Sequence, residues 1–434
     1  MVVALALYGL AMLALAHARV NNDAVEYYDF ARRFAGASVP GVRAYQFGAG
    51  LYDAPFYVLG RLAQVVTGVE TIGGVPLTEM AIALGAAVAL VLTLYVGWLI
   101  LRRFELPAGP GVLLLTVCGT PLVYYTALEP NYKHAVDTLA VTLVAYLMLR
   151  ITDEAEPRLA LLVALGAAFA FAVTVRYADV VMLPGVLLPL LLRRSFQQVR
   201  AVLSAVLLAG VLLFMLPVAR GIPYKSFGTS QGAAAPPARV VELELFPGYE
   251  RLCPPVPVHL NVVQCLRNRF DVQVDLRVPP KMLFSLQRGL FLWTPLTLFA
   301  TLGVVLLFFS RRERRPYLWG LSFAAFCLVA VHLVWDIHWS GGFSFSQRFL
   351  TALFPFFLIG TAELVRRFGA RAMVVLALCC AYSLLLALTI FFGYAHQTAD
   401  DGLRTIAPLF TGGERTPWGV ARTTIAHALG RFGL

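Results

Sequence analysis

The sequence predicts an all-α protein that crosses a membrane repeatedly. Of its 434 residues, 59% are hydrophobic and 14% are charged, and the mean hydropathy is +0.75. A soluble domain carries about 25% charged residues, so a water-soluble fold could not cover this much apolar surface. The apolar residues also gather into long runs, and a run of about 20 residues spans a bilayer as a helix. Lipid is therefore the expected solvent for most of the chain.

We find about eleven such runs, which predict about eleven transmembrane helices. They cover approximately 2–17, 80–101, 110–128, 135–149, 158–175, 180–192, 200–219, 290–309, 317–334, 349–365 and 372–393. The first run lacks the basic start and the small-residue cleavage site of a signal peptide. We therefore expect it to be the first spanning helix.

Arginine clusters between the runs predict the orientation of the chain. Each cluster follows an even-numbered run, and their members are Arg102 and Arg103; Arg150 and Arg158; Arg193, Arg194 and Arg200; Arg311, Arg312, Arg314 and Arg315; and Arg366, Arg367 and Arg371. Cytoplasmic loops are enriched in arginine and lysine, so these connections and the N-terminus are predicted to be cytoplasmic. The net charge of +11 then reflects orientation, and we expect no binding of nucleic acid.

The remaining connections are predicted to face outward. We expect one transmembrane domain over 1–393, which includes a first outer loop at 18–79 and a long outer loop at 220–289, and then an outer tail at 394–434 without assigned chemistry. Cys253 and Cys265 share the long loop, either as a disulfide or as two free thiols. Function concentrates on loops that a rigid scaffold holds in place, so the outer face is the predicted active face.

Two stretches of the first outer loop predict helices that lie at the membrane surface. Apolar and aromatic residues recur at helical spacing from Val25 to Phe34, and Asp23 is a suitable N-cap for this helix. A second stretch runs over 54–63, and Pro55 suits its first turn. From spacing alone, Asp23 is either a helix cap or a functional carboxylate.

Polar residues at the predicted outer ends of the spans are the candidate functional groups. The link 129–134 contains Glu129, Tyr132 and Lys133, and it is either a site or a solvated connection. Arg176 and Asp179 have the spacing of a helical ion pair. Arg288 and Arg348 come just before outer helix starts, where a guanidinium group either binds phosphate or extends to the headgroup region from an aromatic turn.

Three patches resemble the GT-C superfamily of membrane glycosyltransferases, in particular the bacterial branch similar to protein O-mannosyltransferases and lipid A aminoarabinose transferases. The first is an aspartate after span one, in the segment 22–34. The second is 287–295, which looks like the family's R-G-L-x-x-x-x-P stretch. The third is 339–350, which looks like W-x-G-G-x-S-x-G-x-R-x-L but has Ser346 where we expect glycine.

The resemblance implies an inverting glycosyltransferase of the bacterial cytoplasmic membrane, with a polyprenyl-phosphate-linked sugar as donor. It implies Asp23 as the general base that activates an acceptor hydroxyl on the outer face. Arg348, Arg288, Arg176, Lys133 and Tyr132 would then bind the donor phosphate. Glu26, Asp53, Glu129 and His338 would orient the substrates. The acceptor, whether glycan, lipid or protein, stays open. No motif for a catalytic metal is present, so we expect none.

Two other functions share several of these features. A lipid-linked sugar transporter or flippase would place polar residues at mid-membrane and often contains inverted repeats. The predicted spans hold almost no ionisable residues at their centres, which favours a site at the membrane surface. A glycan polymerase would use the same class of donor, and the sequence does not separate it from a transferase.

Overall fold

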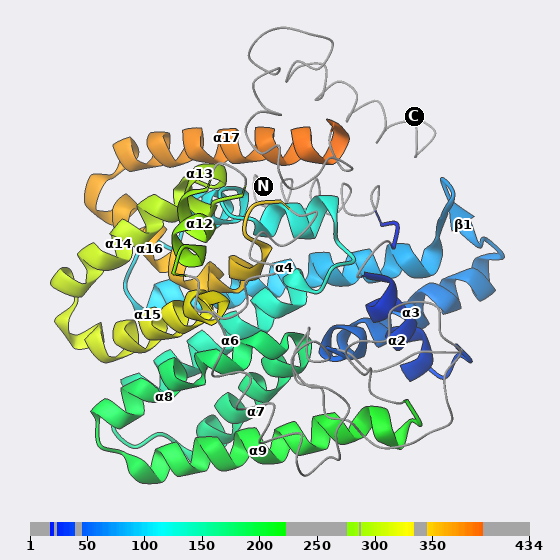
Figure 1. The fold of residues 1–434 in the computed structure, drawn as a ribbon, viewed down its shortest axis with the longest axis horizontal. Helices are drawn as coiled ribbons and strands as arrows, with labels where there is room; N and C mark the ends of the chain where they lie inside the picture. The colour runs from blue at the N-terminus through cyan, green and yellow to red at the C-terminus, as the bar shows by residue number, and fades with distance from the viewer. Residues whose placement is uncertain are drawn as a thin grey trace, which may run out of the picture.

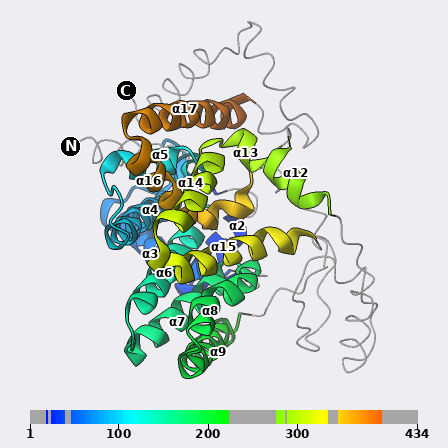
Figure 2. The same ribbon diagram turned by 90° about the vertical axis from the view of Figure 1, so that its left-hand side faces the viewer.

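The computed structural model describes residues 18–20, 24–39, 46–222, 276–285, 288–333 and 345–393. Helices lie side by side in one bundle (Figure 1), and α17 and α9 form opposite edges of it (Figures 1 and 2). The predicted first span, most of the long outer loop and the tail lie outside the described residues.

Five described helices are long and apolar enough to cross a membrane. They are α4 (Leu77–Arg103), α6 (His134–Asp153), α9 (Phe196–Ala219), the continuous pair η6 (Arg348–Leu353) and α16 (Phe354–Phe368), and α17 (Ala370–Gly393). Shorter apolar helices are α7 (Leu159–Val175), η2 (Tyr177–Met182) with α8 (Leu183–Leu192), and α14 (Leu296–Ser310). The predicted polytopic helical fold is thus found, while the count of eleven spans and their orientation stay predictions.

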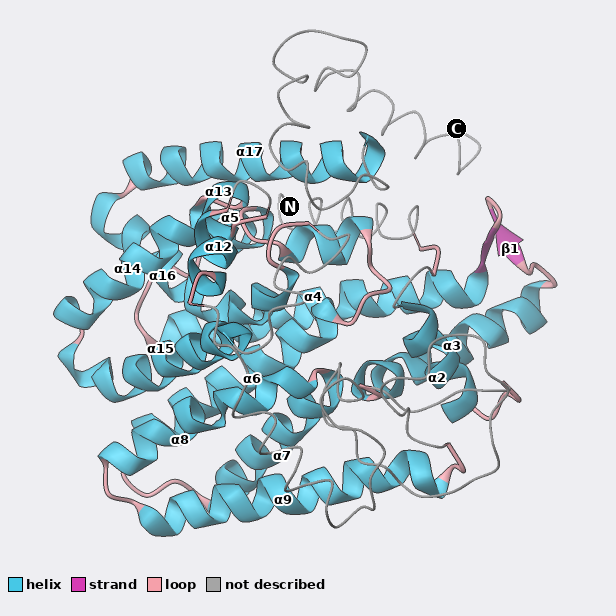
Figure 3. Ribbon diagram, in the orientation of Figure 1, coloured by secondary structure: helices cyan, strands magenta, loops and turns pink. Residues whose placement is uncertain are grey.

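The other described elements are short or connect these helices. They are α5 (Pro110–Cys118), η1 (Tyr124–Leu128), α12 (Val278–Phe284), α13 (Leu290–Trp293), η3 (Arg312–Arg314), α15 (Arg315–Ala330) and η4 (Val331–Leu333). One antiparallel strand pair, β1 (Thr71–Ile72) and β2 (Val75–Pro76), precedes α4 (Figure 3). Apolar runs that proline or glycine interrupts, such as the run at 110–128, form two shorter helical pieces.

Both stretches that we expected to be helical in the first outer loop are helices, α2 (Ala24–Phe34) and α3 (Gly48–Thr67). The rings of Tyr28 and Tyr57 meet edge to face at 5.8 Å and join the two helices. The prediction for Pro55 was wrong, because α3 begins at Gly48 and Pro55 lies inside it. The extra turns form because small residues at the start of α3 let it approach α2 and α7 closely.

The helix ends differ between the two ends of the bundle. At the end that we predict to face outward, the backbone turns into a π-helix in η1 and into 3-10 helix in η2, η4 and η6. Irregular backbone at membrane depth is tolerated where protein buries it or where it lines a cavity, and π-helical turns are frequent at functional sites. This end therefore has the backbone features of a functional site.

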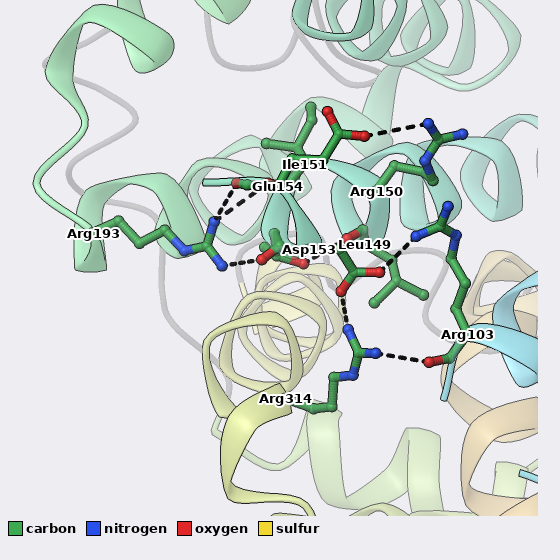
Figure 4. Close-up of polar contacts among 9 residues, drawn as sticks. Arg103, Leu149, Arg150, Ile151, Asp153, Glu154, Arg193 and Arg314 are labelled. Atoms are coloured by element: carbon green, nitrogen blue, oxygen red, sulfur yellow. Dashed lines mark hydrogen bonds and ion pairs between the residues drawn. The ribbon is translucent and has the colours of Figure 1, made fainter. Parts of the chain in front are cut away.

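At the opposite end, Asp153 accepts a hydrogen bond from Arg103 at 2.8 Å and pairs with Arg314 (Figure 4). Arg193 donates to the carbonyl oxygens of Thr152 and, at 3.1 Å, of Glu154. These contacts join the ends of α4, α6 and α8 to the α14–α15 connection. The arginines belong to clusters predicted to be cytoplasmic, and the structure gathers them at one end. Since α6 has 20 residues, its two ends are about 30 Å apart, close to the thickness of a bilayer core.

The approach of α14 to α16 depends on two facing glycines. A Cβ atom on Gly360 would overlap the carbonyl oxygen of Ala300, and one on Gly303 would overlap the carbonyl oxygen of Gly360.

We predict that Gly360→Ala lowers the free energy of unfolding by about 1–3 kcal/mol, because the two backbones have to separate. Gly210→Ala in α9 is the matched control: its Cβ would have no neighbour within 4 Å, and alanine favours a helix by about 1 kcal/mol over glycine. Thermal unfolding in detergent measures both variants, and an equal effect of the two would contradict this packing.

Candidate functional site at the irregular end of the bundle

The segment 345–349 carries Arg348, and an aromatic cluster fixes where it starts. Phe345 is fully buried; its ring stacks on Tyr124 at 5.2 Å and meets Trp293 edge to face at 5.9 Å. The hydroxyl of Tyr125 donates to the carbonyl oxygen of Phe345 at 3.3 Å. Ala24, the first residue of α2, packs into the same cluster. The start of the first-loop helix and the Arg348 segment therefore lie at one place.

The same segment brings Arg288 near Arg348. Gln347 donates a side-chain hydrogen bond to the carbonyl oxygen of Arg288 at 3.1 Å, and Gln347 is fully buried. Burial lowers the pKa of the Arg288 guanidinium; Tyr125 and Tyr124 oppose that shift, and the positive charge of Arg348 adds to it. The two guanidinium groups thus repel each other, and an anion between them would stabilise both.

A second cluster of polar side chains lies next to Phe349, between α6 and η2. The guanidinium of Arg176 is 3.7 Å from a carboxylate oxygen of Asp137 and 3.8 Å from one of Asp179. The pair of Arg176 with Asp179 confirms the i, i+3 ion pair expected from their spacing, but Arg176 has an extended backbone just before η2 and is not in a helix. All three side chains are at most 3% exposed. Arg176 also donates a hydrogen bond to the carbonyl oxygen of Phe349.

The link 129–134 joins the two groups. His134 is buried between them, within electrostatic range of Arg348, Lys133 and Arg176, and its ring lies 4.5 Å from that of Tyr125. The ammonium group of Lys133 lies 5.6 Å from the ring centre of Tyr27 on α2. Arg348, Arg288, Lys133 and Arg176, which come from distant parts of the sequence, therefore lie at one end of the bundle.

The predicted orienting residues are more scattered. Glu26 is half-buried on α2, and Glu129 acts electrostatically on the buried Tyr124. Tyr132, which was predicted to bind the donor phosphate, is buried in the aromatic cluster. Asp53 is buried on α3, and burial raises the pKa of its carboxyl well above the ordinary value, which favours the protonated form. Asp23 and His338 lie outside the described residues.

The described residues contain no group of three histidine, cysteine, aspartate or glutamate side chains that could hold a metal ion. Among the cysteines, Cys118, Cys327, Cys379 and Cys380 are free thiols. Cys253 and Cys265 lie beyond the part of the chain that the structure describes, so their pairing stays a prediction.

Residues 65–220 match the family model described as dolichyl-phosphate-mannose-protein mannosyltransferase. The predicted resemblance to membrane glycosyltransferases is confirmed. The matched segment, residues 65–220, includes Lys133, Asp137, Arg176 and Asp179 and ends before Arg288, so it covers one part of the candidate site. It supports a transferase and leaves the donor and acceptor of this chain open.

Two crystal structures of ArnT from Cupriavidus metallidurans are similar to this chain. The one bound to undecaprenyl phosphate has 15% identity and a TM-score of 0.49, and the match covers 99% of this chain and 75% of that one. The apo form has 16% identity and a TM-score of 0.47, and the match covers 99% of this chain and 74% of that one. A comparison with curated proteins finds no match.

Asp137 is the site residue that the sequence analysis missed. It lies in the first turn of α6, inside the apolar run predicted at 135–149. An ionisable residue within a spanning helix commonly faces the bundle interior and takes part in function. This position was the signal that should have identified Asp137 beside Arg176 and Asp179.

Ser346 explains why glycine is expected in the Arg348 segment. Its φ is +50°, in the left-handed region, and its buried hydroxyl has no hydrogen-bond partner among the residues that the structure describes. We predict that Ser346→Gly raises the free energy of unfolding by up to about 1 kcal/mol, because a non-glycine residue is strained at this φ. Ser204→Gly, in the regular helix α9, should instead lower it by about 0.5 kcal/mol. Denaturation in detergent would measure both, and a loss of stability in Ser346→Gly would argue against the left-handed conformation.

Proposed function

We propose that this protein is an inverting glycosyltransferase, which moves a sugar from a polyprenyl-phosphate-linked donor to an acceptor hydroxyl at the extracytoplasmic face of the bacterial cytoplasmic membrane. One observation carries the proposal: Arg288, Arg348 and Lys133 lie together in a chain whose residues 65–220 match a family of sugar transferases. Dolichyl-phosphate-mannose, the lipid-phosphate-linked sugar in the description of that family, supports the donor class. A transporter is the alternative that the experiments below address, and a glycan polymerase, the other alternative, would use the same class of donor.

The donor phosphate would bind between the guanidinium groups of Arg288 and Arg348. Each guanidinium presents several donors in a planar fork that matches phosphate oxygens. Lys133 would add a third positive charge from the α6 side. When the bond between the anomeric carbon and the phosphate oxygen breaks, negative charge grows on the leaving phosphate, and positioned cations stabilise it most where water is excluded. The polyprenyl chain would extend along the apolar helices into the bilayer.

Asp23 would act as the general base. Its carboxylate accepts the proton of the acceptor hydroxyl while that oxygen attacks the anomeric carbon. The electron pair of the broken bond leaves with the phosphate, and a single displacement inverts the anomeric carbon. One base is enough for this reaction, whereas glycoside hydrolases use two carboxylates. The packing of Ala24 in the aromatic cluster supports this role, because Asp23 is its neighbour in the chain. Glu26, Glu129, Asp53 and His338 are proposed to orient the substrates.

We predict that Arg348→Gln raises the Kd for undecaprenyl phosphate by about 10–100-fold, because a hydrogen bond to a charged group contributes about 1.5–3 kcal/mol. Binding would be measured with the full-length protein in nanodiscs. Arg367→Gln is the matched control, since Arg367 lies near the other end of the same continuous helix and is exposed. An unchanged Kd in Arg348→Gln would remove this residue from the phosphate site.

We predict that Asp23→Asn lowers sugar transfer by a factor of about 10²–10⁴, the usual contribution of a general base, while the Kd for undecaprenyl phosphate stays the same. The assay follows transfer from a panel of polyprenyl-phosphate sugars in nanodiscs. Equal turnover of the variant and the wild type would exclude Asp23 as the base. Binding of the lipid phosphate by the wild type without any turnover across the panel would favour a transporter.

A further inference from the structure

We propose that Arg176 acts on the donor through Arg348, as a positioning residue, and that Asp137 and Asp179 hold Arg176 in place for this role. The inference rests on the proposed function, since it assumes that Arg348 binds the donor phosphate. It changes the role expected for Arg176, which the sequence suggested as a direct phosphate ligand. The contacts of the buried guanidinium carry the inference.

Arg176 has little charge to offer a phosphate. Its guanidinium lies within 4 Å of two buried carboxylates, those of Asp137 and Asp179, so its positive charge is balanced locally. Its side chain is 3% exposed, whereas Arg348 is half-buried. A phosphate that approached Arg176 directly would gain little from it, because the neighbouring acids already offset its positive charge.

Arg176 instead contacts the residue that follows Arg348. It donates a hydrogen bond to the backbone carbonyl oxygen of Phe349, and its guanidinium carbon lies 5.3 Å from the centre of the Phe349 ring. The guanidinium carbon of Arg348 lies 5.2 Å from the same ring centre, and His332 stacks on this ring at 5.1 Å. One phenylalanine therefore links the two arginines through both its backbone and its ring.

The backbone around Phe349 needs this support. Arg348 and Phe349 open η6, a 3-10 helix, and the hydrogen bonds of a 3-10 helix have poorer geometry than those of an α-helix, so an additional donor to one of its carbonyl oxygens helps to fix the turn. Helix α6 also lies against this turn: the Thr138 hydroxyl, which donates to the carbonyl oxygen of His134 at 2.8 Å, lies 3.4 Å from the carbonyl oxygen of Thr351. With its backbone fixed and its guanidinium against the Phe349 ring, Arg348 loses less conformational freedom when it binds phosphate.

Asp137 and Asp179 offset the charge of Arg176 and do not compete for its hydrogen bond to Phe349. The distances of 3.7 and 3.8 Å from the Arg176 Nη1 atom to the carboxylate oxygens of Asp137 and Asp179 are longer than a normal hydrogen bond. The direct hydrogen bond of that nitrogen atom thus goes to Phe349, while the acids neutralise the charge. Asp137 is on α6 and Asp179 is on η2, so Arg176 joins both elements to η6.

A double-mutant cycle on the full-length protein in nanodiscs tests this inference, with the Kd for undecaprenyl phosphate as the readout. The variants are Arg176→Gln, Arg348→Gln and both together. We expect each single change to raise the Kd, Arg176→Gln by about tenfold, and we expect the double variant to bind no more weakly than Arg348→Gln alone. Effects of residues that act through one another are non-additive. Arg103→Gln, which breaks an ion pair at the opposite end of the bundle, should leave the Kd unchanged.

Because Arg176→Gln leaves two buried acids without their cation and the protein can then fail to fold, Arg176→Lys provides a second test. Lysine keeps the charge beside Asp137 and Asp179 but lacks the planar group that faces Phe349, so we expect a folded protein with a raised Kd. Additive losses in the cycle, or a wild-type Kd in Arg176→Lys, would overturn the positioning role and leave the proposed function standing. An unchanged Kd in Arg348→Gln would overturn both.

Discussion

The contact of the buried Arg176 guanidinium with the carbonyl oxygen of Phe349 is the interaction on which the irregular end of the bundle depends. Lipid offers no hydrogen-bond partner, so a spanning helix normally satisfies its own backbone. Departures from the regular helix persist only where side chains take up the remaining groups. Arg176, Tyr125 and Gln347 supply such contacts around the Arg348 segment. The irregular backbone, the buried charges and the proposed donor site are therefore consequences of one arrangement.

The opposite end of the bundle uses arginine differently. There, Arg103 and Arg314 share Asp153, and Arg193 caps the carbonyl oxygens at the end of α6. These contacts join helix ends to each other, and Arg314 makes its contacts from the short 3-10 helix η3 between α14 and α15. A bundle fixed at one end in this way gives the residues at the other end a rigid support, which a site that has to hold a phosphate and a sugar in register requires.

The sequence predicted the parts of this structure that depend on local composition. Apolar runs and helical spacing identify α4, α6, α9 and α2, because burial in lipid or against a neighbouring helix leaves a periodic pattern. The structure adds what depends on distant residues. These are the left-handed backbone of Ser346, the helical turns of α3 that precede Pro55, and the position of Asp137 beside Arg176. Only the folded chain brings Arg176 to Phe349. The roles of Asp23 and His338 stay predictions, because both residues lie beyond the described part of the chain.

An experimental structure of the full-length protein with undecaprenyl phosphate bound tests the central claim most directly, since that claim concerns where one phosphate group lies. The account predicts phosphate density between the guanidinium groups of Arg288 and Arg348, with Lys133 nearby and with Arg176 still in contact with Phe349. Phosphate density at the opposite end of the bundle, beside Arg103 and Asp153, or density in direct contact with Arg176, would contradict it.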